Sequence, residues 1–251
     1  MSRCLLLTRQ PAENQRLAAR LAEHGVRTSS LPLLTLEPCA EVPSERQRML
    51  DLDLYQAVVV VSPVAARLGL ERLDHYWPQP PVGIEWLAVG AGTAQVLRDY
   101  GLPARCPQQG QDSEALLAMP LWQPLLARAD LRVLIWRGED GREHLAEQLR
   151  QAGARVDYLP LYARRMPAEL ERQLLALAPQ VDRIVLLSVQ ALRHWRDAAG
   201  QQWAVQRHWR CFVASERIAA QAREWGCTDV VTCRGADDAA VAAAVLADSS
   251  G

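Results

Sequence analysis

The chain has 251 residues, of which 49% are hydrophobic and 23% charged, and its formal net charge is −1. These values exclude a disordered or fibrous chain and argue against a general binder of nucleic acids or membrane surfaces. All 28 basic residues are arginine, so Schiff-base chemistry, pyridoxal phosphate anchoring and a Walker phosphate-binding loop are excluded, because each requires lysine.

The first predicted element is the apolar run at 4–7, which is too short for a signal peptide. No stretch of the chain approaches the roughly 18 apolar residues of a membrane span. The six cysteines form no Cys-x-x-Cys pair, and several lie in strand-like apolar runs. We therefore expect buried free thiols and a cytoplasmic protein.

An internal repeat organises the chain. Residues 5–33 match residues 133–161 without a gap, with ten identities in 29 positions. Each copy of this unit A predicts a short strand that ends at Arg9 or Arg137, a helix that stops at a glycine, and a second strand. A strand, helix, strand order with short connections is typical of parallel strands.

A second unit, B, also recurs. Residues 57–62 correspond to 183–188, and 86–90 correspond to 211–215. Third short strands are predicted at 104–106 and 230–232, each followed by a helix that begins near a capping residue, Ser113 or Asp238. The order A, B, A, B supplies two five-stranded α/β domains. The sequence leaves open whether the first A pairs with the first B or with the second; crossed pairing would place the crossovers in the proline-bearing stretches around 34–52 and 162–180.

The strand ends carry the candidate chemistry. In open parallel sheets, ligands bind beyond the carboxyl ends of the strands, where helix N-termini present free backbone N–H groups. The residues at six such ends are small, hydroxyl-bearing or basic, which favours an anion: Thr8, Arg9, Ser62, Pro63, Gly90, Ala91, Gly92, Thr93, Arg137, Gly138, Ser188, Ser215, Glu216 and Arg217. Helix capping alone explains each serine or threonine equally well, so the prediction rests on the six ends together.

Other kinds of functional site have weaker support in the sequence. The stretch 90–94 superficially suggests a dinucleotide fingerprint, but Gln95 stands where the third glycine belongs. The five histidines lack metal-ligand spacing, so no metal site is expected.

Tyr162 occupies the position of Leu34 in the first copy. It is either a packing residue with a satisfied hydroxyl or a proton donor, and without further information packing is favoured.

Several short motifs follow one another along nearly the whole chain: Leu7-Thr8-Arg9, Val61-Ser62-Pro63, Ala-Val-Gly-Ala-Gly-Thr-Ala at 88–94, Arg137-Gly138, Gly-Ala-Arg-Val at 153–156 and Tyr162 after Leu-Pro-Leu. In this order, and with the doubled architecture, they resemble the uroporphyrinogen-III synthase family. Each motif alone is weak, and the ordered combination carries the resemblance. One departure is 215–219, Ser-Glu-Arg-Ile-Ala, where the counterpart of the threonine in Gly-x-x-Thr-Ala is Ile218.

The resemblance implies a fold of two flavodoxin-like, parallel-sheet α/β lobes with the crossed pairing, joined by a two-stranded connector. Lobe 1 would comprise 1–35 and 172–251, lobe 2 would comprise 40–165, and the connector strands would be 34–40 and 162–172. It also implies an enzyme that uses no cofactor or metal. We further expect a monomer with no nucleic-acid or membrane partner.

The implied activity is that of a lyase of heme biosynthesis. It closes the linear tetrapyrrole hydroxymethylbilane into uroporphyrinogen III, with inversion of the last pyrrole ring through a spiro intermediate and loss of water. The family binds this polycarboxylate between its lobes, largely through backbone amides at helix ends. The tyrosine that matches Tyr162 is the family's candidate for the acid that assists departure of the hydroxyl, which favours a functional Tyr162. The alternative is a non-enzymatic two-lobed sensor of a small anionic ligand, against which the lack of a recognisable effector segment counts.

Overall fold

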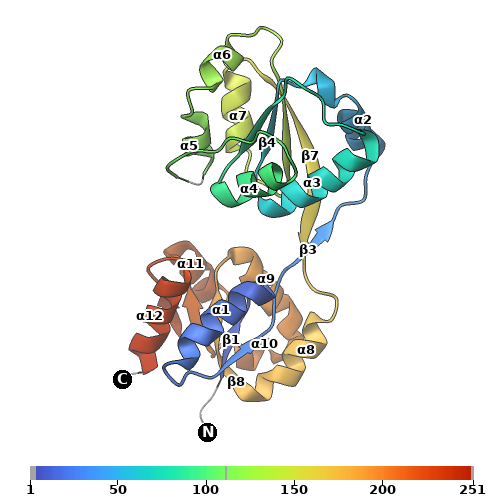
Figure 1. Cartoon of the computed structure of the whole chain (residues 1–251). Helices are drawn as coiled ribbons and strands as arrows, with labels where there is room; N and C mark the ends of the chain where they lie inside the picture. Colours follow the sequence, from blue (N-terminus) through green and yellow to red (C-terminus); the bar gives the residue numbers. More distant parts are fainter. Residues whose placement is uncertain (1–3, 111, 250–251) are drawn as a thin grey trace. The chain divides into compact units, whose positions relative to one another are not determined.

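The structure, a computed structural model, describes residues 4–110 and 112–249. The chain forms two compact units. Unit 1 comprises residues 1–35 and 165–251, and unit 2 comprises residues 36–164. Each unit contains one five-stranded sheet with helices on both faces (Figure 1).

Unit 1 has the strand order β10-β9-β8-β1-β2. Its elements are β1 (Cys4–Leu7), α1 (Pro11–Ala22), β2 (Thr28–Ser30), α8 (Leu170–Leu177), η2 (Ala178–Gln180), β8 (Val181–Leu186), α9 (Val189–Ala199), η3 (Gly200–Gln202), α10 (Trp203–Gln206), β9 (Arg210–Val213), α11 (Glu216–Glu224), β10 (Val230–Thr232) and α12 (Asp238–Ser249). All four of its strand pairs are parallel. Helices α1 and α12 cover one face of the sheet, and α8, α9 and α11 cover the other.

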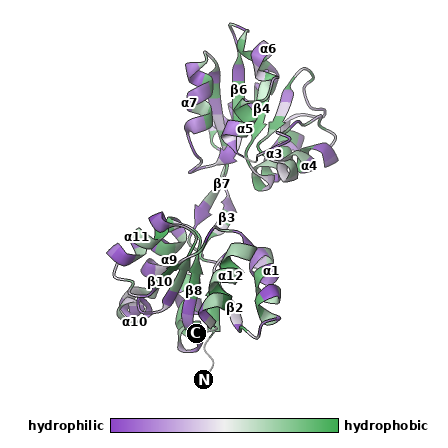
Figure 2. Cartoon of the chain, turned by 90° about the vertical axis from the view of Figure 1, so that its left-hand side faces the viewer, coloured by the Kyte–Doolittle hydropathy of each residue, from purple (hydrophilic) through white to green (hydrophobic). Residues whose placement is uncertain are grey.

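Unit 2 contains the sheet of order β3-β7-β6-β4-β5. Its elements are β3 (Thr35–Pro38), α2 (Pro43–Leu50), η1 (Leu52–Leu54), β4 (Ala57–Val60), α3 (Pro63–Tyr76), β5 (Glu85–Ala88), α4 (Ala91–Asp99), α5 (Ser113–Leu117), α6 (Trp122–Leu126), β6 (Arg132–Gly138), α7 (His144–Gln151) and β7 (Arg155–Arg165). Helices α2, α3 and α4 pack on one face, and α5, α6 and α7 pack on the other. The central strands are hydrophobic, whereas α7 carries hydrophilic residues (Figure 2).

Strand pairing decides between the two arrangements that the repeat allows. Strand β1, from the first A unit, lies between β2 and β8, with Leu5 opposite both Thr28 and Arg183. Strand β6, from the second A unit, lies between β4 and β7. Each A unit therefore pairs with the B unit of the other half of the chain. The predicted α/β fold with crossed pairing is confirmed.

Three local predictions need correction. Strand β7 ends at Arg165 and α8 begins at Leu170, so the connector strand does not continue to residue 172. Within 104–106, only Arg105 pairs with the sheet, through an isolated bridge to Leu87. The cap of α5 is Asp112 rather than Ser113, because the Asp112 carboxylate accepts a hydrogen bond from the Ala115 N–H at 2.8 Å.

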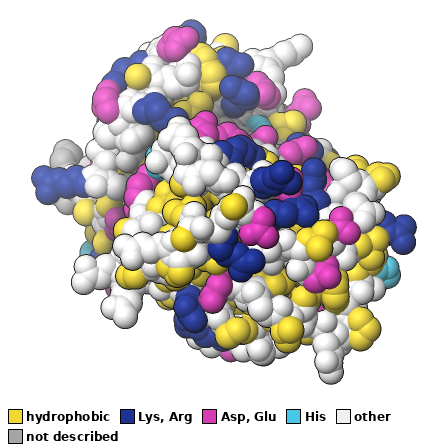
Figure 3. Space-filling view, turned by 90° about the horizontal axis from the view of Figure 1, so that it is seen from above, with side chains coloured by type: hydrophobic (Ala, Val, Ile, Leu, Met, Phe, Trp, Pro, Cys, Tyr) yellow, Lys and Arg dark blue, Asp and Glu magenta, His cyan; other side chains and the backbone are white. Residues whose placement is uncertain are grey.

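The surface shows no separation of charge on the face drawn in Figure 3, where basic and acidic side chains lie interspersed. This arrangement agrees with the formal net charge of −1. Within the described ranges, none of the helices combines the length and the apolar character that crossing a membrane would require.

The core of unit 2 yields a stability prediction at Gly69 of α3. A methyl group at this position would overlap the fully buried ring of Trp136 on β6. Because both groups are in the packed core, Gly69→Ala should lower the free energy of unfolding by about 1–3 kcal/mol, measured by urea-induced unfolding. Gly92→Ala is the matched control, since nothing lies within 4 Å of a methyl group there. Equal stability of the two variants would contradict the prediction.

Candidate active site

The predicted site residues divide between the two units, at the ends of parallel strands. Unit 2 contains nine of them: Ser62, Pro63, Gly90, Ala91, Gly92, Thr93, Arg137, Gly138 and Tyr162. Unit 1 contains the other six: Thr8, Arg9, Ser188, Ser215, Glu216 and Arg217. Because parallel strands present their carboxyl ends at one edge of a sheet, each group gathers at the carboxyl edge of its own sheet.

Tyr162 is held from three directions in unit 2. The residue is 5% exposed, and its hydroxyl oxygen lies 3.2 Å from the Ser62 hydroxyl oxygen. Gly138 is paired with Tyr162 across β6 and β7, and a Cβ at Gly138 would lie 2.8 Å from the Tyr162 ring. The Tyr162 carbonyl accepts a hydrogen bond from the Glu139 N–H at 2.8 Å. The phenol therefore has a defined position at the strand ends.

Ser62 begins α3. Its hydroxyl accepts a hydrogen bond from the Ala65 N–H at 3.1 Å, and Pro63 occupies the first helical position. Proline suits this position, because its fixed φ matches the helix and the first turn needs no donor. The same hydroxyl therefore caps the helix and contacts Tyr162.

Helix α4 begins beside α3 with a short glycine-containing stretch. Gly90 is the N-cap, and its carbonyl accepts a hydrogen bond from the Thr93 N–H at 3.1 Å. The Thr93 side chain is buried, whereas Gly92 is exposed. The first N–H groups of a helix lack carbonyl partners within it, so this exposed turn offers amides to an anion.

Arg137 is a buried cation with internal partners. Its side chain is 5% exposed, forms an ion pair with Glu143 at 2.8 Å, and donates to the carbonyls of Gly138 and Gly141. Its guanidinium also stacks on the Tyr158 ring, 4.3 Å from the centroid. Hydrogen bonds from Tyr158 and Arg137 hold the pKa of Glu143 below its ordinary value. Arg137 therefore fixes the loop after β6.

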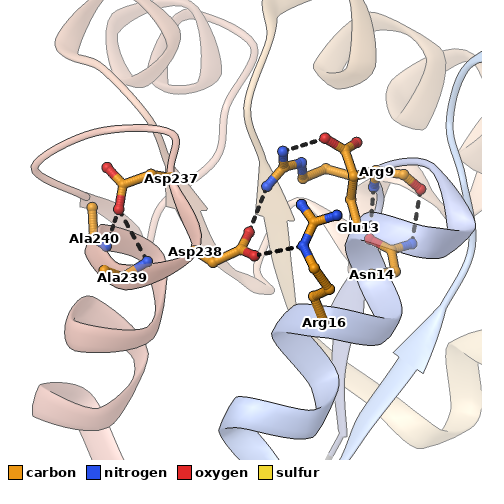
Figure 4. Close-up of polar contacts among 8 residues, drawn as sticks. All are labelled: Arg9, Glu13, Asn14, Arg16, Asp237, Asp238, Ala239 and Ala240. Carbon is orange, nitrogen blue, oxygen red and sulfur yellow. Dashed lines mark hydrogen bonds and ion pairs between the residues drawn. The ribbon is translucent and has the colours of Figure 1, made fainter. Parts of the chain in front are cut away.

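Arg9, the repeat mate of Arg137, is also paired, as Figure 4 shows. It forms ion pairs with Glu13 of α1 and, at 2.7 Å, with Asp238 at the start of α12. The Arg9 backbone N–H donates to the buried Asn14 side chain at 3.0 Å. Arg9 therefore links the two helices that cover one face of the unit 1 sheet.

The remaining unit 1 residues lie at the starts of α9 and α11. Ser188 caps α9 by accepting a hydrogen bond from the Ala191 N–H at 3.0 Å, and Ser215 is the N-cap of α11. Hydrogen bonds from Arg223 and Thr232 lower the pKa of Glu216. Arg217 is exposed and forms no ion pair with any residue of the described ranges. It is thus the strand-end arginine whose charge is available to a ligand.

Sequence reasoning missed the partners of the two paired arginines. Asp238, Glu143 and Tyr158 are far from their arginines in the chain or lie on other elements. No motif marks them. Only Glu13, which follows Arg9 by four residues and lies in the first turn of α1, could have indicated a partner.

A cavity of about 750 Å³ in unit 1 lies away from these residues. It is found where β8 and β9 begin and is lined by charged residues, among them Arg210 and Asp229. Arg210 is neutralised by ion pairs with Asp229 at 2.7 Å and with Asp248. Within 4–110 and 112–249, no group of three or more His, Cys, Asp or Glu side chains is arranged to hold a metal ion.

Comparison with known proteins gives consistent matches. Residues 15–243 match the family model described as "Uroporphyrinogen-III synthase HemD". Proteins named uroporphyrinogen-III synthase from Salmonella typhimurium and Escherichia coli are 32% and 30% identical over 248 and 247 residues, in each case covering 94% of this chain and 97% of the relative.

Two solved structures share the fold. A mutant uroporphyrinogen III synthase from Thermus thermophilus has a TM-score of 0.56 at 18% identity, with 98% of this chain and 97% of that chain covered. Uroporphyrinogen-III synthetase from Helicobacter pylori has a TM-score of 0.58 at 14% identity, with 98% and 99% covered.

Proposed function

This chain belongs to the uroporphyrinogen-III synthase family, and we propose how its residues carry out the cyclisation of hydroxymethylbilane to uroporphyrinogen III. The observation that carries the proposal is the Tyr162 hydroxyl, which Ser62 and Gly138 hold at the carboxyl edge of the unit 2 sheet. The activity classes the chain as a lyase, since the cyclisation releases water.

Substrate binding relies on backbone amides and on the exposed guanidinium of Arg217. The helices α3, α4, α9 and α11 each begin at a strand end with a serine or glycine N-cap. Such N-termini combine free N–H groups with the positive end of the helix dipole, and they stabilise carboxylates. Arg217 supplies a direct charge, whereas Arg9 and Arg137 maintain the loops, because internal carboxylates already neutralise them.

In the chemical step, Tyr162 donates its proton to the hydroxyl of the terminal hydroxymethyl group. The carbon–oxygen bond breaks, water leaves, and the electron-rich pyrrole stabilises the cation. The substituted carbon of the last ring then attacks, so the main task of the protein is to hold the reacting carbons together. After the rearrangement, the ring carbon loses a proton, which returns to the Tyr162 oxygen. Protons and water therefore balance.

The test supplies hydroxymethylbilane to the purified protein and separates the isomers of the product. We expect the type III isomer, formed faster than the non-enzymatic type I isomer appears in buffer. Type I product alone, at the rate found in buffer, would overturn the proposal and leave the sensor alternative.

Arg217 provides a separate prediction about binding. Arg217→Ala should raise KM by on the order of fivefold with little change in kcat, since an exposed cation contributes roughly 1 kcal/mol to binding a carboxylate. Arg172→Ala is the matched control, because Arg172 is an exposed arginine of α8 whose ion-pair partner among the described residues is Glu169, at 2.5 Å. An unchanged KM in the Arg217 variant would show that this arginine does not contact substrate.

A further inference from the structure

We propose that Ser62 is a positioning residue for Tyr162: it directs the phenol proton toward the substrate and stabilises the tyrosinate that forms. This inference rests on the proposed role of Tyr162 as the acid. It assigns Ser62 a task beyond capping α3 or contacting the substrate.

The first argument is the hydrogen-bonding capacity of the Ser62 hydroxyl. A serine hydroxyl has one donor and two acceptor positions. One acceptor position is occupied by the Ala65 N–H at 3.1 Å, and the Tyr162 hydroxyl oxygen lies 3.2 Å away. If Ser62 donates to Tyr162, the phenol proton stays free for the substrate. If Tyr162 donates to Ser62, that proton is engaged.

Proton transfer selects the first arrangement. Once Tyr162 has given its proton to the leaving hydroxyl, its oxygen can only accept, and the Ser62 O–H is placed to donate to it. The Ser62 oxygen is itself polarised by the Ala65 N–H at the positive end of α3. Stabilisation of the developing tyrosinate therefore extends from the helix through Ser62 to the phenol oxygen.

The internal repeat provides a comparison within the same chain. In unit 1, Ser188 caps α9 through the Ala191 N–H at 3.0 Å, as Ser62 caps α3. The repeat mate of Tyr162 in that unit is Leu34, which packs against the unit 1 core and has no hydroxyl. Capping therefore explains the serine in both units, but only in unit 2 does the capping hydroxyl also meet a phenol.

The residues around Ser62 and Tyr162 hold the contact between the two hydroxyl groups in place. The Ala65 hydrogen bond fixes the direction of the Ser62 side chain, and Pro63 fixes the backbone that follows it. On the other side, the ring of Tyr162 lies against Gly138, where no Cβ intervenes. The Ser62 hydroxyl is thus preorganised, so little reorganisation is needed when charge develops on Tyr162.

Three substitutions separate capping from positioning. Ser62→Gly removes the hydroxyl but keeps most of the cap stability, because glycine is tolerated at an N-cap; Ser62→Ala removes both; Ser62→Thr keeps both. We expect kcat to fall about tenfold in the glycine and alanine variants, with KM within about twofold of the wild type, and to stay within about threefold in the threonine variant. Asp112→Ala, which removes the exposed cap of α5, should leave kcat unchanged.

The decisive measurement is Ser62→Gly in a Tyr162→Phe background. A residue that acts through Tyr162 has nothing left to orient there, so the second substitution should not lower kcat further. A further tenfold loss in that background, a rise in KM alone, or wild-type kcat in the Ser62→Gly single variant would overturn the inference. These outcomes are interpreted only if the wild type forms the type III isomer. Failure of the proposed function is a separate result, because the wild type would then give only the type I isomer.

Discussion

Tyr162→Phe is expected to lower kcat by about 100-fold while the protein remains folded. General acids contribute roughly 100-fold to 10,000-fold to rate, and the lower value applies because the pyrrole already stabilises the cation that forms. The ring keeps its packing against Gly138, and the lost hydroxyl contact with Ser62 contributes only about 1 kcal/mol to stability. Single-turnover formation of the type III isomer measures the loss of rate, and urea-induced unfolding measures the change in stability.

Tyr100→Phe is the matched control for this variant. Tyr100 follows α4, and its hydroxyl donates to Asp74, a hydrogen bond that, with partial burial, raises the pKa of Tyr100 to about 12. Its removal deletes a tyrosine hydroxyl without affecting the strand ends, so kcat should be unchanged. Equal rates in the Tyr162→Phe variant and the wild type would return Tyr162 to the role of a packing residue.

Arg137→Ala is expected to lower the free energy of unfolding by about 2–3 kcal/mol. The substitution leaves a cavity beside Tyr158 and removes the hydrogen bonds to the carbonyls of Gly138 and Gly141. Glu143 is half-exposed and stays hydrated, so no buried charge is left unpaired. Urea-induced unfolding measures the loss, and activity should fall as well because Gly138 supports Tyr162.

Arg9→Ala is the comparison, because Arg9 is the repeat mate and its side chain is more exposed, at 22%. Its loss should cost roughly 1 kcal/mol. If Arg137→Ala unfolds like the wild type but has a higher KM, Arg137 contacts the substrate instead of supporting the loop.

The stability loss in the Arg137→Ala variant depends on pH. The pKa of Glu143 is lowered in the folded protein, so the stability it contributes is present above its ordinary pKa and is lost as the pH falls through the folded value. The difference in stability between the wild type and Arg137→Ala should therefore narrow on acidification below the ordinary titration range of glutamate. A difference that stays constant over that range would show that the Glu143 contact contributes nothing.

The amino-acid sequence by itself determined the elements and their repetition. Apolar runs such as 57–60 and 133–136 are local patterns that form buried parallel strands, and each is followed by capping residues that begin a helix. Because the carboxyl ends of parallel strands share one edge, the same patterns also placed Ser62 and Arg137 at an edge of a sheet.

Only the tertiary structure decided which partners these elements take. Leu5 pairs not only with Thr28 of the adjacent strand but also with Arg183 from the other half of the chain, and the Tyr162 hydroxyl meets a serine 100 residues away. Arg9 and Arg137 occupy equivalent sequence positions, yet their partners come from different elements. Hydrogen bonds and ion pairs between distant segments depend on how strands and helices pack, which local periodicity does not encode. The sequence therefore located the candidate groups, and packing determined which of their donors remain available for chemistry.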